Sequence, residues 1–596
     1  MSIRVNFAGA SLIRPGAYSD TQVADSSLAS PSLGVLALIG EADAGPSFAN
    51  ETGLSAVTFG PDEFAAIQEK YVSGELVDAA KIAIAPSQDP QIKGGAQQLV
   101  LIKTNASVAA SLVILQGANP YGTLKAKNAG AAGNSISYAC AQTSSQAVIT
   151  ISDLTSGASE ISSPLGGNTV LSVLCTDSAA SAATMTIDAT SFSVTVTGGT
   201  AQSFSAPLSQ FKVVKQLVDF INSFAGFTAT ASSSTMGTKT TSSLDQQAAV
   251  SIKTTAAPIK MDVAEVQAFF AKSALVSFSS TIMSGIPGVR TKTFLSGGAL
   301  GATSGAAIQS AIDACLKQRI NFLVPLFSRD ASDDIAETLT DPNSTYVISA
   351  IHAGIAAHCN QASTVIGRKE RQAWVGFKGT YANTVSAQSN LDSNRVSICL
   401  QDIKVVSAST ALSTYKQPHM VAVIAAAMKC AAPIGLPNTY KAVICSDVRH
   451  TQFDETHADQ GLQDNLTFIS KAPNGGFRFE LDNNSYSSNT NSWIYNRPSV
   501  LYSADIAAYS IRLNTEQFVG QRNSDVSEES VKNLLVGVMD QLKSAGIIVG
   551  DAPSKGKGYK DLSVKILGSI LNISVTLVLV EGLEFVLNTI KVQRAG

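Results

Sequence analysis

The stretch ISVTLVLVEGLEFVLNTIKV, residues 573–592, carries most of the information about how this chain is built. Apolar residues occupy every second position, first up to Leu579 and again after the pair Glu581 and Gly582. Such alternation predicts β-strand, because successive side chains of a strand point to opposite faces of its sheet. We therefore expect strands close to this end of the chain.

The beginning of the chain repeats the pattern on a smaller scale. Ile3, Val5 and Phe7 alternate with Arg4 and Asn6. Strands near two ends of a chain can add to the sheets of neighbouring copies. We predict inter-subunit strand contacts by Ile3, Val5, Phe7, Leu583, Phe585, Leu587 and Val592. The acceptor strands are predicted to contain Val564, Ile566, Ile573, Val575 and Leu577.

The composition favours a subunit that packs against other copies. The chain has 596 residues, enough for two to four domains, and 45% of them are hydrophobic. Only 15% are charged, whereas about 25% is typical of a soluble protein. Lys and Arg (42) nearly balance Asp and Glu (45), so no basic surface indicates direct binding of nucleic acid.

The sequence also indicates where the chain is made. Its seven cysteines are scattered without a CxxC motif, which is typical of reduced thiols in a cytosol. We find no signal peptide at the start of the chain. The longest apolar run, residues 420–428, is too short for a membrane helix of about 20 residues, so we expect no membrane insertion.

Changes in composition predict the domain organisation. Strands and helices alternate in two blocks, which are separated by a Ser/Thr-rich segment of short strands. We expect an N-terminal arm (1–30), a discontinuous α/β core domain (31–118 and 286–464), a β-rich inserted surface domain (119–285), a C-terminal polymerisation domain (465–582) and a C-terminal arm (583–596).

One helix of the polymerisation domain is predicted in detail. Asp525, with Glu528 three residues later, resembles a capping box, and Gly546 is a suitable end. Apolar residues at helical spacing follow, including Val531 and Leu535. The opposite face is a candidate contact surface formed by Lys532, Asp540 and Lys543.

A search for a reaction centre finds no GxSxG, HExxH or GxGxxG motif, so we predict no catalytic, cofactor-binding or metal-binding residues. The one polar cluster of interest is Asp447, His450, Asp454, Glu455, His457 and Asp459. His450 and His457 could share a helical face with Asp454 and bind a metal ion. We favour a solvated acidic stretch between a strand and a helix, because metal ligands usually have tighter spacing.

Several short stretches, in this order along the chain, resemble the tail sheath proteins of contractile-tailed bacteriophages and related contractile injection systems. These stretches are RPGAY (14–18), GVLALIG (34–40), LKAKNAGAAGNSI (124–136), FLSGGALG (294–301), NLTFISKAPN (465–474) and LKSAG (542–546). Each is a weak motif of turns and strand edges, but together they span nearly the whole chain.

The resemblance implies a multidomain α+β or α/β fold, in which terminal strands of neighbouring subunits complete a C-terminal sheet. It implies a structural subunit without enzymatic activity or cofactors, located in the virion tail after assembly in the host cytoplasm. Its partners would be its own copies in stacked hexameric rings, an inner tail tube protein, and baseplate and tail-terminator proteins. Lys532, Asp540 and Lys543 would be possible contacts to the inner tube. Contraction would drive the tube through the target cell envelope for genome ejection.

Two other functions remain open at this point. The chain could form another self-assembling viral or surface structure, such as a filament or capsid. It could also be a hydrolase whose site is built from the acidic and histidine cluster at residues 447–459.

Overall fold

The computed structural model describes residues 5–7, 10–12, 33–46, 56–143, 145–473, 475–487, 493–584 and 587. The chain has a mixed α/β fold with several sheets and divides into two compact units. The larger unit contains residues 34–432 and 437–498. The smaller unit contains residues 433–436 and the described residues from Ser499 onward, together with the first strands of the chain.

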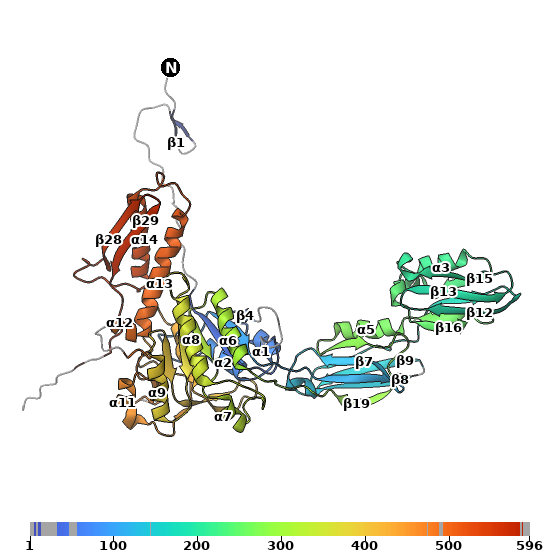
Figure 1. Ribbon diagram of the computed structural model, residues 1–596, viewed down its shortest axis with the longest axis horizontal. Helices are drawn as coiled ribbons and strands as arrows, with labels where there is room; N and C mark the ends of the chain where they lie inside the picture. The colour runs from blue at the N-terminus through green and yellow to red at the C-terminus, as the bar shows by residue number, and fades with distance from the viewer. Residues whose placement is uncertain are drawn as a thin grey trace, which may run out of the picture. The chain divides into compact units, whose positions relative to one another are not determined.

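A six-stranded sheet organises the larger unit, in the order β22-β21-β20-β3-β5-β4. Its edge strand β4 is labelled in Figure 1. Its strands are β3 (Val35–Gly40), β4 (Ala56–Phe59), β5 (Gln98–Lys103), β20 (Phe322–Pro325), β21 (Gln372–Gly376) and β22 (Val396–Cys399). Five strands are parallel, and only the edge strand β4 is antiparallel. Numbered along the chain, the parallel strands follow the order 5-4-3-1-2, which is that of a flavodoxin-like doubly wound sheet.

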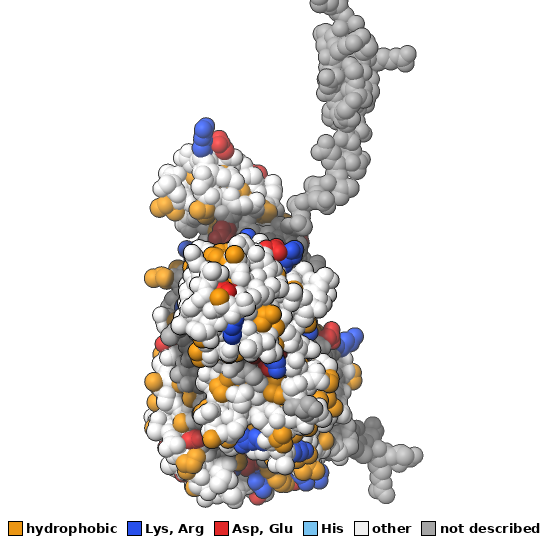
Figure 2. Space-filling model, turned by 90° about the vertical axis from the view of Figure 1, so that its right-hand side faces the viewer, with side chains coloured by type: hydrophobic (Ala, Val, Ile, Leu, Met, Phe, Trp, Pro, Cys, Tyr) orange, Lys and Arg blue, Asp and Glu red, His pale blue; other side chains and the backbone are white. Residues whose placement is uncertain are grey.

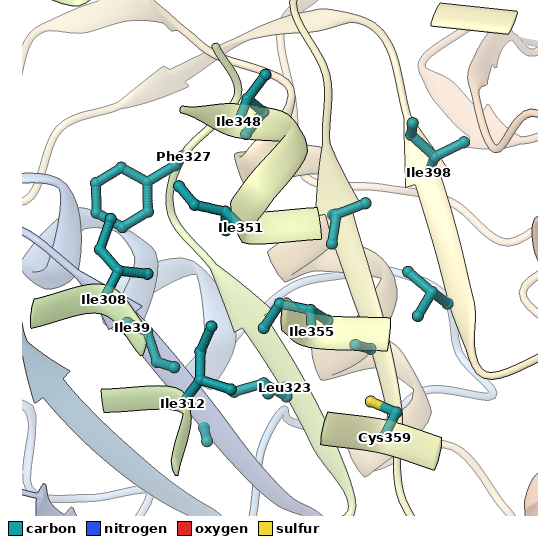
Figure 3. Packing of buried hydrophobic residues seen from close by; sticks show 14 of the residues in the cluster. Ile39, Ile308, Ile312, Leu323, Phe327, Ile348, Ile351, Ile355, Cys359 and Ile398 are labelled. Atoms are coloured by element: carbon teal, nitrogen blue, oxygen red, sulfur yellow. The ribbon is translucent and has the colours of Figure 1, made fainter. Parts of the chain in front are cut away.

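Helices cover this sheet and bury its strands. All six residues of β3 are buried, as expected for a parallel strand with both faces covered. Helices α6 (Gly305–Ala314) and α8 (Ile348–Ala362) form one core with the sheet, in which Ile312, Leu323 and Ile355 lie close together (Figure 3). Helices α2 (Glu75–Ile84) and α10 (His419–Ala431) pack against each other and against β3.

Smaller elements complete this α/β part. The helices are α1 (Phe64–Tyr71), α7 (Ala331–Ala336), α9 (Tyr381–Leu391), α11 (Ala458–Gln463) and α12 (Trp493–Asn496). A three-stranded sheet contains β23 (Asp402–Val406), β24 (Ser413–Lys416) and β25 (Asp447–Arg449), and a hairpin contains β26 (Ile469–Lys471) and β27 (Phe477–Phe479).

The chain between β5 and α6 is rich in strands. They are β6 (Ser111–Gln116), β7 (Asn119–Ala126), β8 (Ile136–Thr143), β9 (Gln146–Asp153), β10 (Ser159–Ile161), β11 (Thr169–Cys175), β12 (Ala180–Ile187), β13 (Ser191–Gly198), β14 (Phe204–Pro207), β15 (Phe227–Ala231), β16 (Gln247–Ser251), β17 (Ala257–Lys260), β18 (Val276–Ser280) and β19 (Arg290–Phe294). Helices α3 (Val214–Asn222), α4 (Ser234–Gly237) and α5 (Asp262–Lys272) lie among them. Two separate hydrophobic clusters hold this β-rich part together, one of them centred on α3.

The β-rich part joins the α/β part through two neighbouring chain segments. Val108 pairs with Ala299 through two backbone hydrogen bonds of 3.0 and 3.1 Å, and Ser111 pairs with Ser296. The chain therefore leaves the α/β part and returns to it at adjacent positions. The face drawn in Figure 2 shows isolated charged side chains on a largely uncharged surface, in line with the low charge of the sequence.

The smaller unit contains α13 (Pro498–Thr515), α14 (Glu528–Ser544) and the antiparallel hairpin of β28 (Tyr559–Leu567) and β29 (Ile570–Leu577). Val531 and Leu535 of α14 form its core with Val564 of β28. Near the start of the chain, β1 (Val5–Phe7) pairs with β2 (Ala10–Leu12).

The start of α14 differs from the sequence prediction. The helix begins at Glu528 and is capped by Ser527, whose side chain accepts a hydrogen bond of 3.0 Å from the backbone N–H of Ser530. Asp525 was the predicted cap, but a helix starting at Ser527 places two acidic residues in its first turn, where the helix dipole favours them. The predicted end at Gly546, which has a positive φ of 72°, is confirmed.

Candidate assembly surfaces

The predicted strand between Ile573 and Leu577 is confirmed as part of β29. Its apolar side chains are half-buried, whereas the residues between them are exposed. Ile573 lies opposite Val564, and Leu577 lies opposite Tyr559. Within the described residues the sheet has only these two strands, so each strand presents an outer edge to which a further strand can pair.

The side chains of the predicted acceptor strands face the subunit's own helix. Val564 is buried against Val531 and Leu535 of α14, and Ile573 packs against this cluster. Ile566, Val575 and Leu577 are half-buried. What the hairpin offers a partner is therefore mainly backbone hydrogen-bonding groups rather than these side chains.

A pocket lies beside the turn of the same hairpin. It has a volume of about 380 Å³ and is lined by Phe518, Val526, Ile566 and Leu571, among others. Gln521, Asn523 and Ser569 also line it, and its apolar side chains can contact a leucine-sized side chain, whose full burial is worth about 1.5–3 kcal/mol.

The structure describes some of the predicted arm residues. Val5 and Phe7 lie in β1, where they pair with Leu12 and Ala10 of β2. Leu583 and Leu587 are 90% and 92% exposed. Ile3, Phe585 and Val592 lie outside the described residues.

The pairing of β1 with β2 was missed by the sequence reasoning, which expected a single strand in this arm. Gly9, between the two short apolar segments, is a hairpin signal that could have indicated it.

The outward face of α14 is exposed as predicted. Lys532, Asp540 and Lys543 are all exposed, while the opposite face is buried. The Nζ atom of Lys543 also donates a hydrogen bond of 2.7 Å to the carbonyl oxygen of Gly556. This face is therefore available to a partner.

The acidic and histidine cluster at residues 447–459 does not form the metal site that a shared helical face would have allowed. His450 follows β25, and His457 ends a short 3-10 helix, so no single helix carries both side chains. Nδ1 of His457 lies 2.8 Å from Oδ1 of Asp454, and both residues are largely exposed. Among the residues that the structure describes, no group of three His, Cys, Asp or Glu side chains could hold a metal ion.

The carboxyl ends of β3 and β20 are the position at which doubly wound proteins bind ligands. Here the subunit's own side chains fill it: Oγ of Ser328 lies 3.0 Å from Nδ1 of His419, whose Nε2 lies 3.2 Å from Oε2 of Glu75. Ser328 also accepts a hydrogen bond from the backbone N–H of His419 and is completely buried. This Ser-His-Glu set is a packed structural network, because no substrate can reach the hydroxyl group.

A buried carboxyl group beside this network gives the fold a pH dependence. Burial, with the nearby charges of Asp334 and Glu75, raises the pKa of Glu41 to about 7, although Thr340 donates a hydrogen bond to it. The folded chain therefore binds more protons than the unfolded chain between about pH 4.5 and 7. This contribution to stability is present below pH 4.5 and is lost as the pH rises towards 7.

We expect Glu41→Gln to raise the melting temperature at pH 8 and to leave it nearly unchanged at pH 4.5, because the amide mimics the protonated carboxyl group. Thermal unfolding between pH 4.5 and 8 measures this. The exposed control Glu69→Gln should follow the wild type throughout. A Glu41→Gln curve parallel to that of the wild type would contradict the assignment.

Comparisons with known proteins identify the fold. No protein-family model matches the chain, and no curated protein sequence does. Among solved structures, the chain is similar to the sheath tail protein from Desulfitobacterium hafniense at 14% identity, over 92% of this chain and 93% of that one, with a TM-score of 0.53. It is also similar to the sheath tail protein Lin1278 from Listeria innocua at 13% identity, over 92% and 93%, with a TM-score of 0.51.

The chain therefore resembles a sheath tail protein in fold, as the sequence motifs indicated. The two sheath tail proteins named above share that fold over almost their entire length. The contracted helical sheath of the anti-feeding prophage aligns with 52% of this chain at 15% identity, and its TM-score of 0.36 is too low to bear on the fold. No helix in the described part of the chain is long and apolar enough to cross a membrane.

Proposed function

We propose that the protein is the structural subunit of a contractile tail sheath, which polymerises helically around an inner tube. The observation that carries the proposal is the likeness in fold to two sheath tail proteins over 92% of the chain. The buried Ser-His-Glu network and the partly exposed 447–459 cluster support no catalytic step. The machine would be a phage tail or a related contractile injection system, in which contraction drives the tube through a cell envelope and, in a phage, the genome is ejected.

The terminal strands would link the subunits. An arm from a neighbouring copy adds to the outer edge of the β28–β29 hairpin, and an exposed leucine such as Leu583 or Leu587 enters the adjacent apolar pocket. Backbone hydrogen bonds return only about 0.5–1.5 kcal/mol each, so apolar burial is needed to offset the cost of ordering the arm. We also propose the domain division predicted from the sequence. It consists of the two arms, an α/β core (31–118 and 286–464), an insert (119–285) and a polymerisation domain (465–582).

The same linkage permits contraction. Strand pairing survives rigid-body movement of the subunit bodies if the arms bend, while the body-to-body contacts change to a better packing. A gain of a few kcal/mol per subunit would add up over stacked hexameric rings. The extended sheath would then be a metastable state held by a kinetic barrier.

Further partners follow from this function. The exposed face of α14 with Lys532, Asp540 and Lys543 would contact the inner tube, whose surface would carry complementary charges. Baseplate and tail-terminator proteins would bind the two ends of the sheath. Assembly would take place in the host cytoplasm, and the mature location would be the virion tail.

Electron microscopy of the purified full-length chain tests the proposed function. Wide hollow tubes, or short and broad contracted sheaths, are the expected result. Thin fibrils or flat arrays would instead favour a different filament or surface protein. A protein that stays monomeric at high concentration would contradict the proposal.

The β-rich part should be dispensable for assembly. The pairing of β6 with β7 and of β19 with β8 shows that a deletion limited to residues 119–285 would leave two strands without partners. Replacing residues 109–298 by Asn-Gly is a better design, because a two-residue turn can close the hydrogen-bonded pair of Val108 and Ala299.

We expect this shortened chain to form tubes of smaller outer diameter, which sedimentation and electron microscopy would detect. The matched control replaces the same residues by a flexible linker of about ten Gly and Ser residues. If both shortened chains are insoluble, the β-rich part is required for the fold of the α/β part and the prediction is wrong.

A further inference from the structure

Segments at the two ends of β20 carry opposite charges. At the amino ends of β20 and β21, segments 317–319 and 364–371 contain five basic residues and one acidic residue. These are Lys317, Arg319, Arg368, Lys369 and Arg371, with Glu370. At the carboxyl end of β20, residues 330–341 contain five acidic residues and no Lys or Arg. These are Asp330, Asp333, Asp334, Glu337 and Asp341.

The two basic segments lie against each other, and we name them the basic end; Lys317 and Arg368 are exposed, whereas Arg371 is buried. Nζ of Lys369 donates to the carbonyl oxygen of Leu316 at 2.7 Å. Arg371 donates to the carbonyl oxygen of Cys315 at 2.8 Å. These contacts hold the segment before β21 against the segment before β20.

An apolar tip projects from the basic end. Val365 and Ile366 are 90% and 92% exposed, although both are β-branched apolar residues. They lie in an ordered turn, in which the backbone N–H of Gly367 donates to Oγ1 of Thr364 at 3.0 Å. Two adjacent apolar side chains are held in solvent and are surrounded by basic residues. Such a surface suits a partner that offers exposed apolar side chains among acidic ones.

Residues 330–341 form the complementary acidic end. Arg329 pairs with Asp334 and Glu337 at 2.7 and 2.6 Å, so it offsets only part of the negative charge. Asp333 is exposed, and Asp330 accepts a hydrogen bond of 2.7 Å from the backbone N–H of Ile348.

The acidic end also exposes apolar side chains. Leu339 and Val347 are 49% and 52% exposed. Helix α8 begins at Ile348, whose backbone N–H donates to Asp330 of the acidic end, and its last residue, Ala362, accepts a hydrogen bond from the backbone N–H of Lys369 in the basic end. Figure 3 shows the helix from Ile348 to Cys359. Its 15 residues place the two ends about 22 Å apart on the same subunit.

We propose that these ends bind each other between copies, so that the basic end of one subunit docks head-to-tail on the acidic end of the next. The inference rests on the proposed function, and it names a body-to-body contact in addition to the exchange of terminal strands. A contact between two different surfaces of the same chain leaves one of these surfaces available on each end copy. Further copies can therefore add, and they form a ring if the rotation closes or a helical filament if it does not. Val365 and Ile366 would pack against Leu339 and Val347, while the surrounding charges set the orientation.

Charge reversal in the full-length chain tests this contact. We expect Lys317→Glu with Arg368→Glu to raise the critical concentration for tube formation by about tenfold or more, because three acidic residues would then offset the three remaining basic residues of the basic end. Lys212→Glu with Lys239→Glu in the β-rich part changes the net charge equally on exposed residues and should assemble as the wild type does. Thermal unfolding of the unassembled chains would verify that both variants fold.

Restored assembly is the decisive measurement. Adding Asp333→Lys to the Lys317→Glu and Arg368→Glu chain places a positive charge on the acidic end that can pair with the new glutamates, and it should recover part of the assembly. Ile366→Ser alone should weaken assembly, and adding Asp333→Lys to that variant should not restore it. Tubes of the wild type together with unimpaired tubes of the charge-reversed variant would overturn the inference and leave the proposed function standing. A wild type that forms no tubes would contradict the proposed function itself.

Discussion

A chain that ends at Gly582 is expected to fold normally and to form no tubes. The deletion removes the exposed Leu583 and Leu587 of the predicted C-terminal arm. It keeps Val578, whose carbonyl oxygen accepts a hydrogen bond of 2.9 Å from the backbone N–H of Val549. It also keeps Val580, whose backbone N–H donates to the carbonyl oxygen of Ile547 at 3.1 Å. We therefore expect sedimentation to show only small species, with a melting temperature close to that of the full chain.

The matched control for this truncation removes exposed apolar area elsewhere. Leu583→Ser with Leu587→Ser should weaken assembly strongly, whereas Leu154→Ser, at a residue that is 71% exposed in the β-rich part, should not. Deletion of residues 1–20 should also abolish assembly. Normal tubes from either truncated chain would show that strand exchange does not hold the subunits together.

Lys429→Met is expected to lower the free energy of unfolding by about 3–5 kcal/mol. Nζ of Lys429 lies 2.5 Å from Oδ2 of Asp482, and both side chains are 2% exposed. Loss of the ammonium group removes this ion pair from a buried carboxylate, and truncating one partner of a buried ion pair costs much more than the pair contributes. Chemical denaturation of the unassembled chain measures this change.

An exposed ion pair in the same chain provides the control. Lys215 and Asp219 are 3.0 Å apart on α3, with side chains that are 71% and 59% exposed. Lys215→Met should therefore change stability by less than about 0.5 kcal/mol. Adding Asp482→Asn to Lys429→Met should recover part of the loss. A small effect of Lys429→Met would show that water reaches this site.

The elements that could be predicted from sequence are those with strong periodicity. The strand at Ile573 and the buried positions of α14 follow from the spacing of apolar residues alone, because one face of each element lies against the core and the other faces solvent. The motif resemblance identified the fold because turns and strand edges recur in order, although no single motif is specific.

Features that depend on contacts between distant segments could not be predicted. Ser328, His419 and Glu75 meet only because β20, α10 and α2 converge at one end of the sheet. The charge separation between residues 330–341 and 364–371 is likewise invisible until the strand directions are known. The cap of α14 was misplaced by two residues because Asp525 and Ser527 are both suitable caps.

The pairing of Val108 with Ala299 has a consequence for how this chain can vary. The chain between them enters and leaves at two neighbouring residues, so a lineage could exchange that whole module provided that the replacement again supplies donors to the carboxylate of Asp43, which accepts hydrogen bonds of 2.8 and 3.0 Å from the backbone N–H groups of Ala131 and Ala132. A foreign domain whose own termini lie side by side could be mounted at the same place, and each copy in an assembly would then display it.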